Sequence, residues 1–403
     1  MLVVLTTVLQ MLEWILIALA LLALFWLFLV LANRRYHLEK RGFTITPGVL
    51  MWRTKRGLRF IDRVGGTCRR GWLAFGTVAA VIGVALMIFM LFGLCLNAFF
   101  VFSRPEVSLP GVRFALPGLI PGLTIHWWLI AIASLLLVHE FAHGFVTRAQ
   151  GIPIKSMGGL FLVVIPGAFV EPDEKKLKGA PVFKRLRIFG VGSFANVLFA
   201  FLCLGIILLL LTPKPGVYVW GVRENGPSEN FLTPGMHILG LDNVPLESWG
   251  DYYDFIENVN PGENVSILTE NGILTVVTDN YRSENEGDLG IWPASAIPRS
   301  NFINPLTGMG VMVLELTGQP VFHPYLYDSL APWWLIDALK WIFVLNLGIG
   351  LFQLLPIMPL DGGYLFQGVV EAASSKRTSR RVARALSFIV LALLLVNFVP
   401  LFT

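Results

Sequence analysis

Residues 126–149 read HWWLIAIASLLLVHEFAHGFVTRA, an apolar run that is interrupted near its end by the motif HEFAH. An apolar stretch of about 20 residues is long enough to cross the hydrocarbon core of a bilayer as a helix. A carboxylate left unpaired at that depth costs about 2.5–3.5 kcal/mol, even on the most lenient insertion scale. His139, Glu140 and His143 therefore need a compensating partner, and we expect that partner to be a cation.

The spacing of these three residues is typical of a metal-binding motif. Residues four apart share one face of a helix, so the imidazoles of His139 and His143 can reach a single ion. Glu140 lies about 100° round the helix, where its carboxylate can contact a water on that ion. A polar cluster bonded to neighbouring helices is the alternative interpretation.

Two histidines leave a catalytic zinc ion short of a ligand, because such sites usually have three protein ligands and a water. The best candidate for the third ligand is Asp361, in the stretch LPIMPLDGG at 355–363. The prolines deny this stretch a regular helix, and Gly362 and Gly363 allow close approach of the backbone. Asp361 could instead cap a following helix at 364–373. Because one ligand is missing, we expect Asp361 to complete a site for one zinc ion.

The composition of the whole chain is that of a membrane protein. Of the 403 residues, 55% are hydrophobic and 14% are charged, whereas about a quarter are charged in soluble proteins. The net charge of +5 does not indicate a nucleic-acid partner, because the basic residues flank apolar runs. Six apolar stretches predict about six transmembrane helices, at roughly 5–32, 72–102, 126–149, 187–211, 335–356 and 383–402.

The basic residues predict how these helices are oriented. Lys and Arg number eleven in 33–70, eight in 148–187 and five in 376–384, together 24 of the 31 in the chain. Alternating spans place these three loops on one side, which the positive-inside rule assigns to the cytosol. Residues 213–333 carry four Lys/Arg and fifteen Asp/Glu, so we expect this insert outside the cytosol. The first apolar stretch is interpreted as a retained span, and a prokaryotic cell membrane is the expected location.

The same patterns divide the chain into four predicted regions. Residues 1–125 hold two spans and a basic cytosolic loop, 126–212 hold the catalytic core, 213–333 form the insert, and 334–403 hold two further spans. Within the core, residues 157–170 form an apolar run that is broken by glycines and a proline. This pattern favours a re-entrant β-hairpin over an interfacial loop.

The insert predicts a small α/β domain. Alternating, β-branched segments begin at Val217, Asn264 and Ile273, between Gly-Pro, Pro-Gly and Asn-Gly turn signals. One helix is expected at 248–258. This order of elements resembles a PDZ domain, which binds an extended peptide as an added strand. Residues 281–333 give no clear pattern.

The separated HExxH and LDGG motifs and the PDZ-like insert together resemble the site-2 protease family of intramembrane metalloproteases. The likeness covers roughly 126–215 and 335–365 by motif. It implies a zinc enzyme that cleaves a transmembrane segment of a membrane-protein substrate and releases a regulator from the bilayer. A family pattern that ends in Asn is similar to GSFAN at 192–196, which implies that Asn196 holds substrate backbone or the developing oxyanion.

Two positions depart from the family pattern. Ser193 stands where proline is common, and Gln353 stands where asparagine is common. Gln353 can still donate and accept hydrogen bonds, so both Gln353 and Asn196 are candidate substrate-binding residues, although Asn196 could equally bond helices together. In the expected mechanism, zinc activates a water and Glu140 takes its proton.

Two other functions stay open at this point. A metal-ion transporter would also place His and Asp in spanning helices, but it predicts polar residues along a pathway and not one compact cluster. A non-catalytic relative would bind transmembrane peptides through the outer domain without cleaving them. The intact HExxH and LDGG motifs favour a protease over both.

Overall fold

The fold is described from a computed structural model, which covers residues 2–104, 114–163, 165–283, 286–319 and 321–401. The chain divides into two compact units. The helical unit comprises Met1–Arg113, Ile132–Phe199 and Gly348–Thr403. The second unit, Phe114–Ala131 and Ala200–Leu347, contains the insert.

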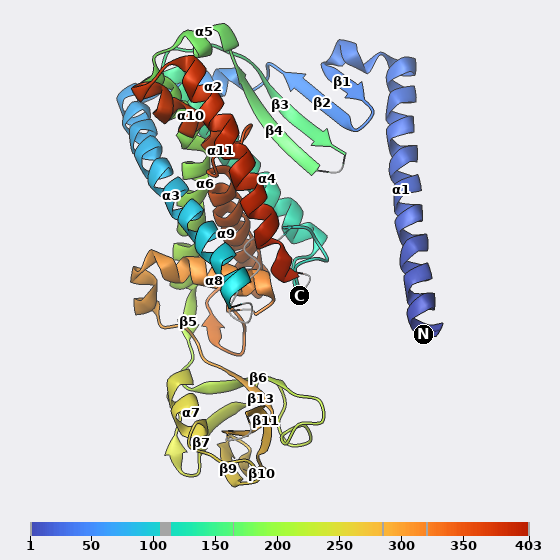
Figure 1. Cartoon of the computed structure of the whole chain (residues 1–403), viewed down its shortest axis with the longest axis vertical. Coiled ribbons are helices and arrows are strands. Elements are labelled where there is room, and N and C mark those ends of the chain that lie inside the picture. Colours follow the sequence, from blue (N-terminus) through green and yellow to red (C-terminus); the bar gives the residue numbers. More distant parts are fainter. Residues whose placement is uncertain (1, 105–113, 164, 284–285, 320, 402–403) are drawn as a thin grey trace. The chain divides into compact units, whose positions relative to one another are not determined.

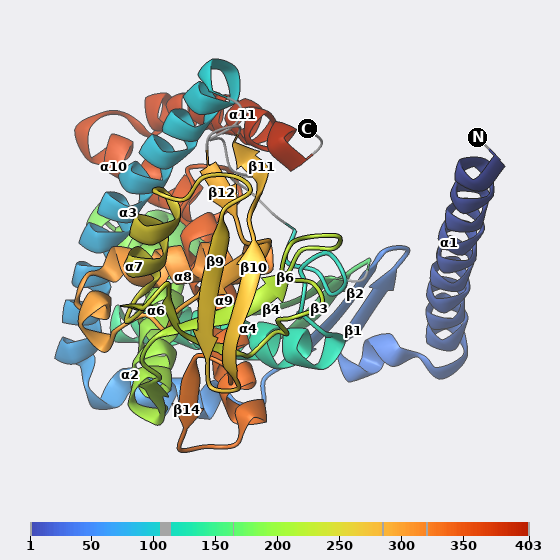
Figure 2. The ribbon, with the colours of Figure 1, turned by 90° about the horizontal axis from the view of Figure 1, so that it is seen from below.

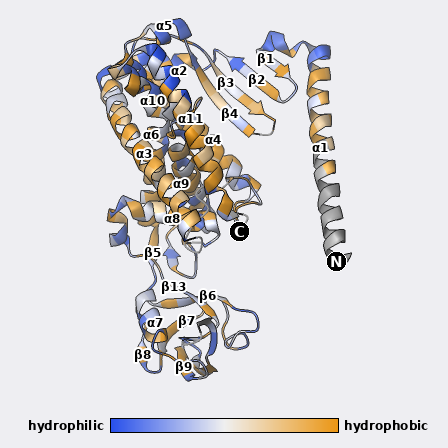
Figure 3. Ribbon diagram, in the orientation of Figure 1, coloured by the Kyte–Doolittle hydropathy of each residue, from blue (hydrophilic) through white to orange (hydrophobic). Residues whose placement is uncertain are grey.

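Each of the six predicted apolar stretches overlaps with a long helix (Figure 1), although residue 402 at the end of the sixth stretch lies outside the described residues. These helices are α1 (Leu2–Tyr36), α3 (Arg69–Ser103), α4 (Ile125–Ala149), α6 (Val182–Leu210), α9 (Trp333–Gln353) and α11 (Lys376–Asn397). Among the described residues, α3, α4, α6 and α9 are the helices long and apolar enough to cross a membrane. Hydrophobic residues predominate along these four (Figure 3). The predicted helical membrane class is therefore supported by four helices, and the count of six spans stays a prediction.

The broken apolar run at 157–170 forms a β-hairpin, as predicted. Its strands, β3 (Ile154–Leu162) and β4 (Ile165–Pro172), belong to an antiparallel sheet of order β1-β2-β3-β4. The partners β1 (Phe43–Thr46) and β2 (Val49–Thr54) come from the basic segment that we interpreted as a loop. Strand β4 therefore lies at one edge of the sheet, and the re-entrant depth of the hairpin stays a prediction.

A short helix that the sequence analysis missed supports the part of α4 that carries HExxH. Helix α2 (Leu58–Thr67) fully buries Ile61, and a Cβ added to Gly144 would lie 3.1 Å from the Ile61 side chain. An ion pair of 2.6 Å joins Asp62 of α2 to Arg148 of α4. These contacts hold the C-terminal half of α4 in place.

The segment around Asp361 is held by close backbone contacts. Helix α10 (Asp361–Ala373) begins at Asp361 itself, earlier than the predicted start at 364. A Cβ on Gly362 would collide with the carbonyl of Leu354, and a Cβ on Gly363 would lie 2.6 Å from the carbonyl oxygen of Ile357. The expected close approach of the backbone at the paired glycines is confirmed.

The predicted α/β character of the insert is also confirmed. Its six-stranded sheet has the order β10-β9-β7-β6-β13, with β8 paired to β7. Strands β9 and β10 lie side by side (Figure 2). The strands are β6 (Val217–Val222), β7 (His237–Leu241), β8 (Val244–Pro245), β9 (Asn264–Thr269), β10 (Gly272–Val277) and β13 (Ile291–Ala294). Helix α7 (Trp249–Ile256) lies within the predicted range and starts with a capping box of Ser248 and Asp251.

The remaining helices and strands of the described chain are short. They are η1 (Leu38–Arg41), α5 (Glu174–Gly179), β5 (Leu211–Pro213), β11 (Asp279–Ser283), β12 (Glu286–Asp288), η3 (Arg299–Ile303), α8 (Pro305–Thr317), β14 (Tyr327–Ser329) and η4 (Val399–Leu401).

Candidate metal centre

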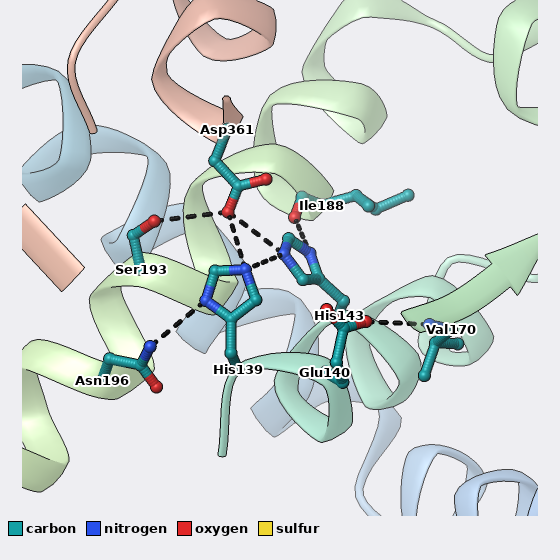
Figure 4. Close-up of polar contacts among 8 residues, drawn as sticks. All are labelled: His139, Glu140, His143, Val170, Ile188, Ser193, Asn196 and Asp361. Atoms are coloured by element: carbon teal, nitrogen blue, oxygen red, sulfur yellow. Dashed lines mark hydrogen bonds and ion pairs between the residues drawn. The ribbon is translucent and has the colours of Figure 1, made fainter. Parts of the chain in front are cut away.

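The side chains of His139, His143 and Asp361 meet at one point (Figure 4). The Nε2 atoms of His139 and His143, one turn apart on α4, are 3.1 Å from each other. Oδ2 of Asp361 lies 3.1 Å from Nε2 of His143 and 3.3 Å from Nε2 of His139. Among the residues that the structure describes, this is the one group of His, Cys, Asp and Glu side chains close enough to share an ion.

This arrangement fits a zinc ion. Zinc lies about 2.0–2.2 Å from nitrogen and oxygen ligands, so ligand atoms at tetrahedral angles are about 3.3–3.6 Å apart. The separations of 3.1–3.3 Å between Nε2 of His139, Nε2 of His143 and Oδ2 of Asp361 are close to that spacing. Two imidazoles and one carboxylate are a donor set that catalytic zinc uses, with the fourth position left open.

The backbone of α6 sets the orientation of His143. Its Nδ1 lies 2.8 Å from the carbonyl oxygen of Ile188. Because a carbonyl can only accept, Nδ1 carries the hydrogen and Nε2 turns its lone pair toward His139 and Asp361.

His139 also contacts a side chain of α6 on the side of its ring that faces away from the cluster. Nδ2 of the wholly buried Asn196 lies 3.3 Å from Nδ1 of His139. Oδ1 of Asn196 has no hydrogen-bond partner in the described part of the chain. A half-turn of the amide would let this oxygen accept a hydrogen from Nδ1 of His139 and leave Nε2 available to a metal.

Glu140 lies beside the cluster and is held by the sheet. Its Oε2 accepts a hydrogen bond of 2.8 Å from the backbone N–H of Val170 in β4 (Figure 4). The sequence analysis did not identify this partner. In the sequence, only the broken apolar run at 157–170 pointed to a segment near Glu140. Which N–H group of this run faces α4 depends on the strand register, and the sequence does not give that register.

Helix α6 approaches the cluster most closely at Gly192 and Ser193. A methyl group on Gly192 would overlap Nε2 of His143 and lie 2.8 Å from Cε1 of His139. The wholly buried Ser193 donates a hydrogen bond of 3.2 Å to Oδ2 of Asp361. The sequence analysis noted Ser193 only as a departure from a family pattern.

Gln353 is the one candidate residue that does not join the cluster. It ends α9 and is half-buried. Within the residues that the structure describes, no hydrogen bond joins its side chain to His139, His143 or Asp361. The structure therefore brings together five of the six predicted site residues.

The sequence comparison decides the family. The family model described as Peptidase family M50 matches residues 127–397, a range that holds both the HExxH and the LDGG motifs. The chain belongs to this family. The predicted resemblance to the site-2 proteases is thereby confirmed, and the four apolar helices agree with an integral membrane metalloprotease of the M50 kind.

Three relatives show how far this M50 peptidase resembles known proteins. The uncharacterised protein MJ0971 of Methanocaldococcus jannaschii is 28% identical over 81% of this chain and 78% of its own length. A membrane-bound transcription factor site-2 protease homolog of Arabidopsis thaliana is 26% identical over 36% of this chain and 28% of its own length. The zinc metalloprotease RasP of Bacillus licheniformis is 22% identical over 56% of this chain and 60% of its own length. The matched part thus spans less than two thirds of the length of the last two relatives.

Among solved structures, the PDZ domain of the SdrC-like protein from Listeria innocua matches a short part of this M50 peptidase. It is 23% identical, with a TM-score of 0.19, and covers 19% of this chain and 92% of that domain.

Proposed function

We propose that this chain hydrolyses peptide bonds within or next to the transmembrane segments of membrane-protein substrates. In this proposal His139, His143 and Asp361 hold one zinc ion, and Glu140 is the catalytic base. The observation that carries it is the meeting of three ligand atoms at 3.1–3.3 Å, with a carboxylate in the next position of the same helix. Metalloprotease relatives and apolar helices support the substrate class.

The residues around the ion have separate roles in the proposed reaction. When bound, zinc polarises the scissile carbonyl and makes a neighbouring water more acidic. Glu140 takes a proton from the attacking water and delivers it to the nitrogen of the leaving amine as the C–N bond breaks. The N–H of Val170 keeps the Glu140 carboxylate beside the two imidazoles for both transfers.

The edge of β4 supports a binding mode for the substrate, because β4 pairs with β3 alone among the described strands. A helical segment hides its carbonyls in hydrogen bonds, so it must unwind before attack. Since the N–H of Val170 points toward Glu140, the N–H and C=O of Ala168, two residues away, face the same open side. An unwound segment can add to β4 there as a further strand, beside the base.

The two predicted substrate-binding residues have different roles in this proposal. Asn196 is wholly buried and adjoins His139, which favours orienting the imidazole over contacting the substrate. Gln353 is half-buried at the last position of α9. In this proposal its side chain binds substrate backbone. The two residues lie on helices that pack closely, because a Cβ on Gly350, one turn before Gln353 in α9, would lie 3.1 Å from Cβ of Asn196.

The topology is also part of the proposal. Six spans place the three basic loops and the metal centre on the cytosolic side of a prokaryotic cell membrane. In the four-region division, the hairpin of 126–212 is re-entrant, and the acidic insert at 213–333 is an outer PDZ-like domain that sorts substrates. The strand order and helix α7 of the insert support this assignment by fold analogy.

A cleavage assay tests the proposal. Purified wild-type protein and Glu140→Gln, both shown to retain zinc, are incubated with a panel of labelled transmembrane peptides. The expected rate for Glu140→Gln is lower by about 10²–10⁴-fold, the usual contribution of a general base. Glu171→Gln is the control, because Glu171 lies in β4 but accepts its hydrogen bond from Ser156.

Two results would overturn the proposal. Equal cleavage by the wild type and Glu140→Gln would remove the base assignment. Zinc transport across vesicles without cleavage of any peptide would replace the protease with a transporter.

A further inference from the structure

Ser193 is a buried polar side chain that the proposed reaction does not use. It is 0% exposed, and its Oγ donates a hydrogen bond of 3.2 Å to Oδ2 of Asp361. The same oxygen lies 3.1 Å from Nε2 of His143 and 3.3 Å from Nε2 of His139. The hydroxyl therefore contacts the one atom of Asp361 that is placed to bind a metal (Figure 4).

We infer that Ser193 is a positioning residue that fixes Asp361 as a one-oxygen ligand of the metal. The inference rests on the proposed zinc site. A carboxylate oxygen has two lone pairs, and the Ser193 hydroxyl occupies one of those on Oδ2. The other lone pair then faces the space between the two imidazoles, and the fourth position of the ion stays open for water and substrate.

Asp361 needs such a contact because its own segment does not hold its side chain. It follows an irregular stretch that contains Pro356 and Pro359, and it is the first residue of α10, directly after the N-cap residue Leu360. Within the described part of the chain, the carboxylate of Asp361 has one polar contact besides those with His139 and His143, and that is the hydrogen bond from Ser193.

The outer contacts of all three ligands come from one helix. On α6, the carbonyl of Ile188 contacts His143, the hydroxyl of Ser193 contacts Asp361, and the amide of Asn196 contacts His139. Between them lies Gly192, where any side chain would strike both imidazoles. Helix α6 thus presents one hydrogen-bonding group to each of the three proposed ligands, and Ser193 supplies the group for Asp361.

Close packing fixes the position of Ser193 itself. A Cβ on Gly350 of α9 would lie 3.3 Å from the carbonyl oxygen of Ser193 and 3.1 Å from Cβ of Asn196. The α6 backbone that carries Ser193 is therefore packed closely against α9, and the Ser193 side chain itself is fully buried.

The test is a measurement of zinc affinity on the purified full chain, by competition with a chromophoric chelator. Ser193→Ala is expected to bind zinc about 10–100-fold more weakly, because the loss of an outer hydrogen bond to a metal ligand has that effect. Ser379→Ala is the matched control. Ser379 is also 0% exposed, but its hydroxyl donates to the backbone carbonyl of Lys376 in α11.

Two further variants separate positioning from folding. Ser193→Thr keeps the hydroxyl and is expected to keep an affinity close to that of the wild type. If Ser193→Ala does not fold, Ser193→Val is compared with Ser193→Thr, because these two side chains have nearly the same shape and differ by a methyl group in place of the hydroxyl. The visible spectrum of the cobalt-loaded protein, which reports ligand geometry, is expected to change in the hydroxyl-free variants and not in Ser379→Ala.

The outcomes distinguish this inference from the proposed function. Zinc affinity and a cobalt spectrum in Ser193→Ala equal to those of the wild type would overturn the role of Ser193 and leave the zinc site intact. A wild-type chain that binds no zinc would instead overturn the proposed site.

Discussion

The helical unit and the insert differ in how their polar and apolar residues are distributed. In the helical unit, Phe102 and Phe388 are 77% and 72% exposed, whereas the polar Asn196 is 0% exposed. In the insert, Val265 and Ile267 are both 0% exposed within an apolar core. The first arrangement suits a unit whose solvent is lipid, and the second suits a domain in water.

This contrast shows which buried polar residues call for a functional explanation. Inside the helical unit, Arg185 pairs with Glu371 at 2.6 Å, and Asn97 bonds to Asn397 at 2.8 Å. Each is a matched pair of donor and acceptor. The His139, His143 and Asp361 cluster instead directs ligand atoms from three groups to one point, an arrangement that suits a cation.

The largest expected effect comes from breaking a matched pair inside the helical unit. Arg185→Met would leave the Glu371 carboxylate buried without a charge partner, which costs about 3–5 kcal/mol. Arg185→Met/Glu371→Met removes both charges at similar volume and should recover most of the loss. Denaturant unfolding in detergent micelles measures both variants. Equal instability of the single and double variants would show that the unpaired charge is not the cause.

The corresponding change in the insert removes apolar contacts. Ile267→Ala in β9 should destabilise the insert by about 3 kcal/mol, because truncating a buried Ile leaves a cavity. Ile273→Ala, on the neighbouring strand β10, is the control, since Ile273 is 68% exposed. Hydrogen exchange of the insert amides in the full chain measures the difference. Similar exchange in the two variants would contradict an apolar core at Ile267.

A third change tests how tightly the polar interior is built around the metal centre. Gly192→Ala would push a methyl group against His143 and His139 and should lower kcat/KM on the order of 100-fold, since small displacements of reacting groups cost that much. Gly205→Ala lies in the same helix, and the described residues leave open space at its added Cβ. Peptide cleavage is measured for both, and equal activity of the two variants would refute the close approach at Gly192.

The smallest expected effect concerns a charge at the surface of the insert. The backbone N–H groups of Glu247 and Ser248 donate to Asp251 at 2.9 and 2.7 Å and lower the pKa of its carboxyl. Since the pKa of the folded state lies below that of the unfolded state, this stabilisation is present above about pH 3.9 and is lost as the pH falls. Protection of the α7 amides should therefore fall between pH 5 and pH 3 in the wild type.

The variant Asp251→Asn supplies the comparison for this pH effect. It should show weaker protection of the α7 amides at pH 5 and a smaller change toward pH 3, after correction for the intrinsic pH dependence of exchange. A wild type and variant with the same pH dependence would remove Asp251 as the source.

The three side chains that meet at the candidate metal centre could be predicted from the sequence because their signals are local. His139 and His143 share a helix face at a spacing of four, and Asp361 stands where prolines and glycines interrupt the helices. The long helices, the hairpin at 157–170 and helix α7 were predicted from apolar length, turn residues and periodicity in the same way.

The hydrogen bonds that the surrounding segments make to the side chains of the site could not be predicted, because they depend on packing between segments that are distant in sequence. The N–H of Val170 reaches Glu140 only through the register of β4. Likewise, Ser193 and Ile188 contact their ligands only because α6 packs against α4 and α10. Strands β1 and β2 were missed because the charged residues around them suggested a connecting loop.

Metal analysis of purified protein by mass spectrometry tests the central claim most directly. The wild type should carry one zinc ion per chain, and Asp361→Ala should carry none while its helix content stays unchanged. An Asp361→Ala variant with the zinc content of the wild type, or a wild type that cleaves peptides with no bound metal, would contradict the account.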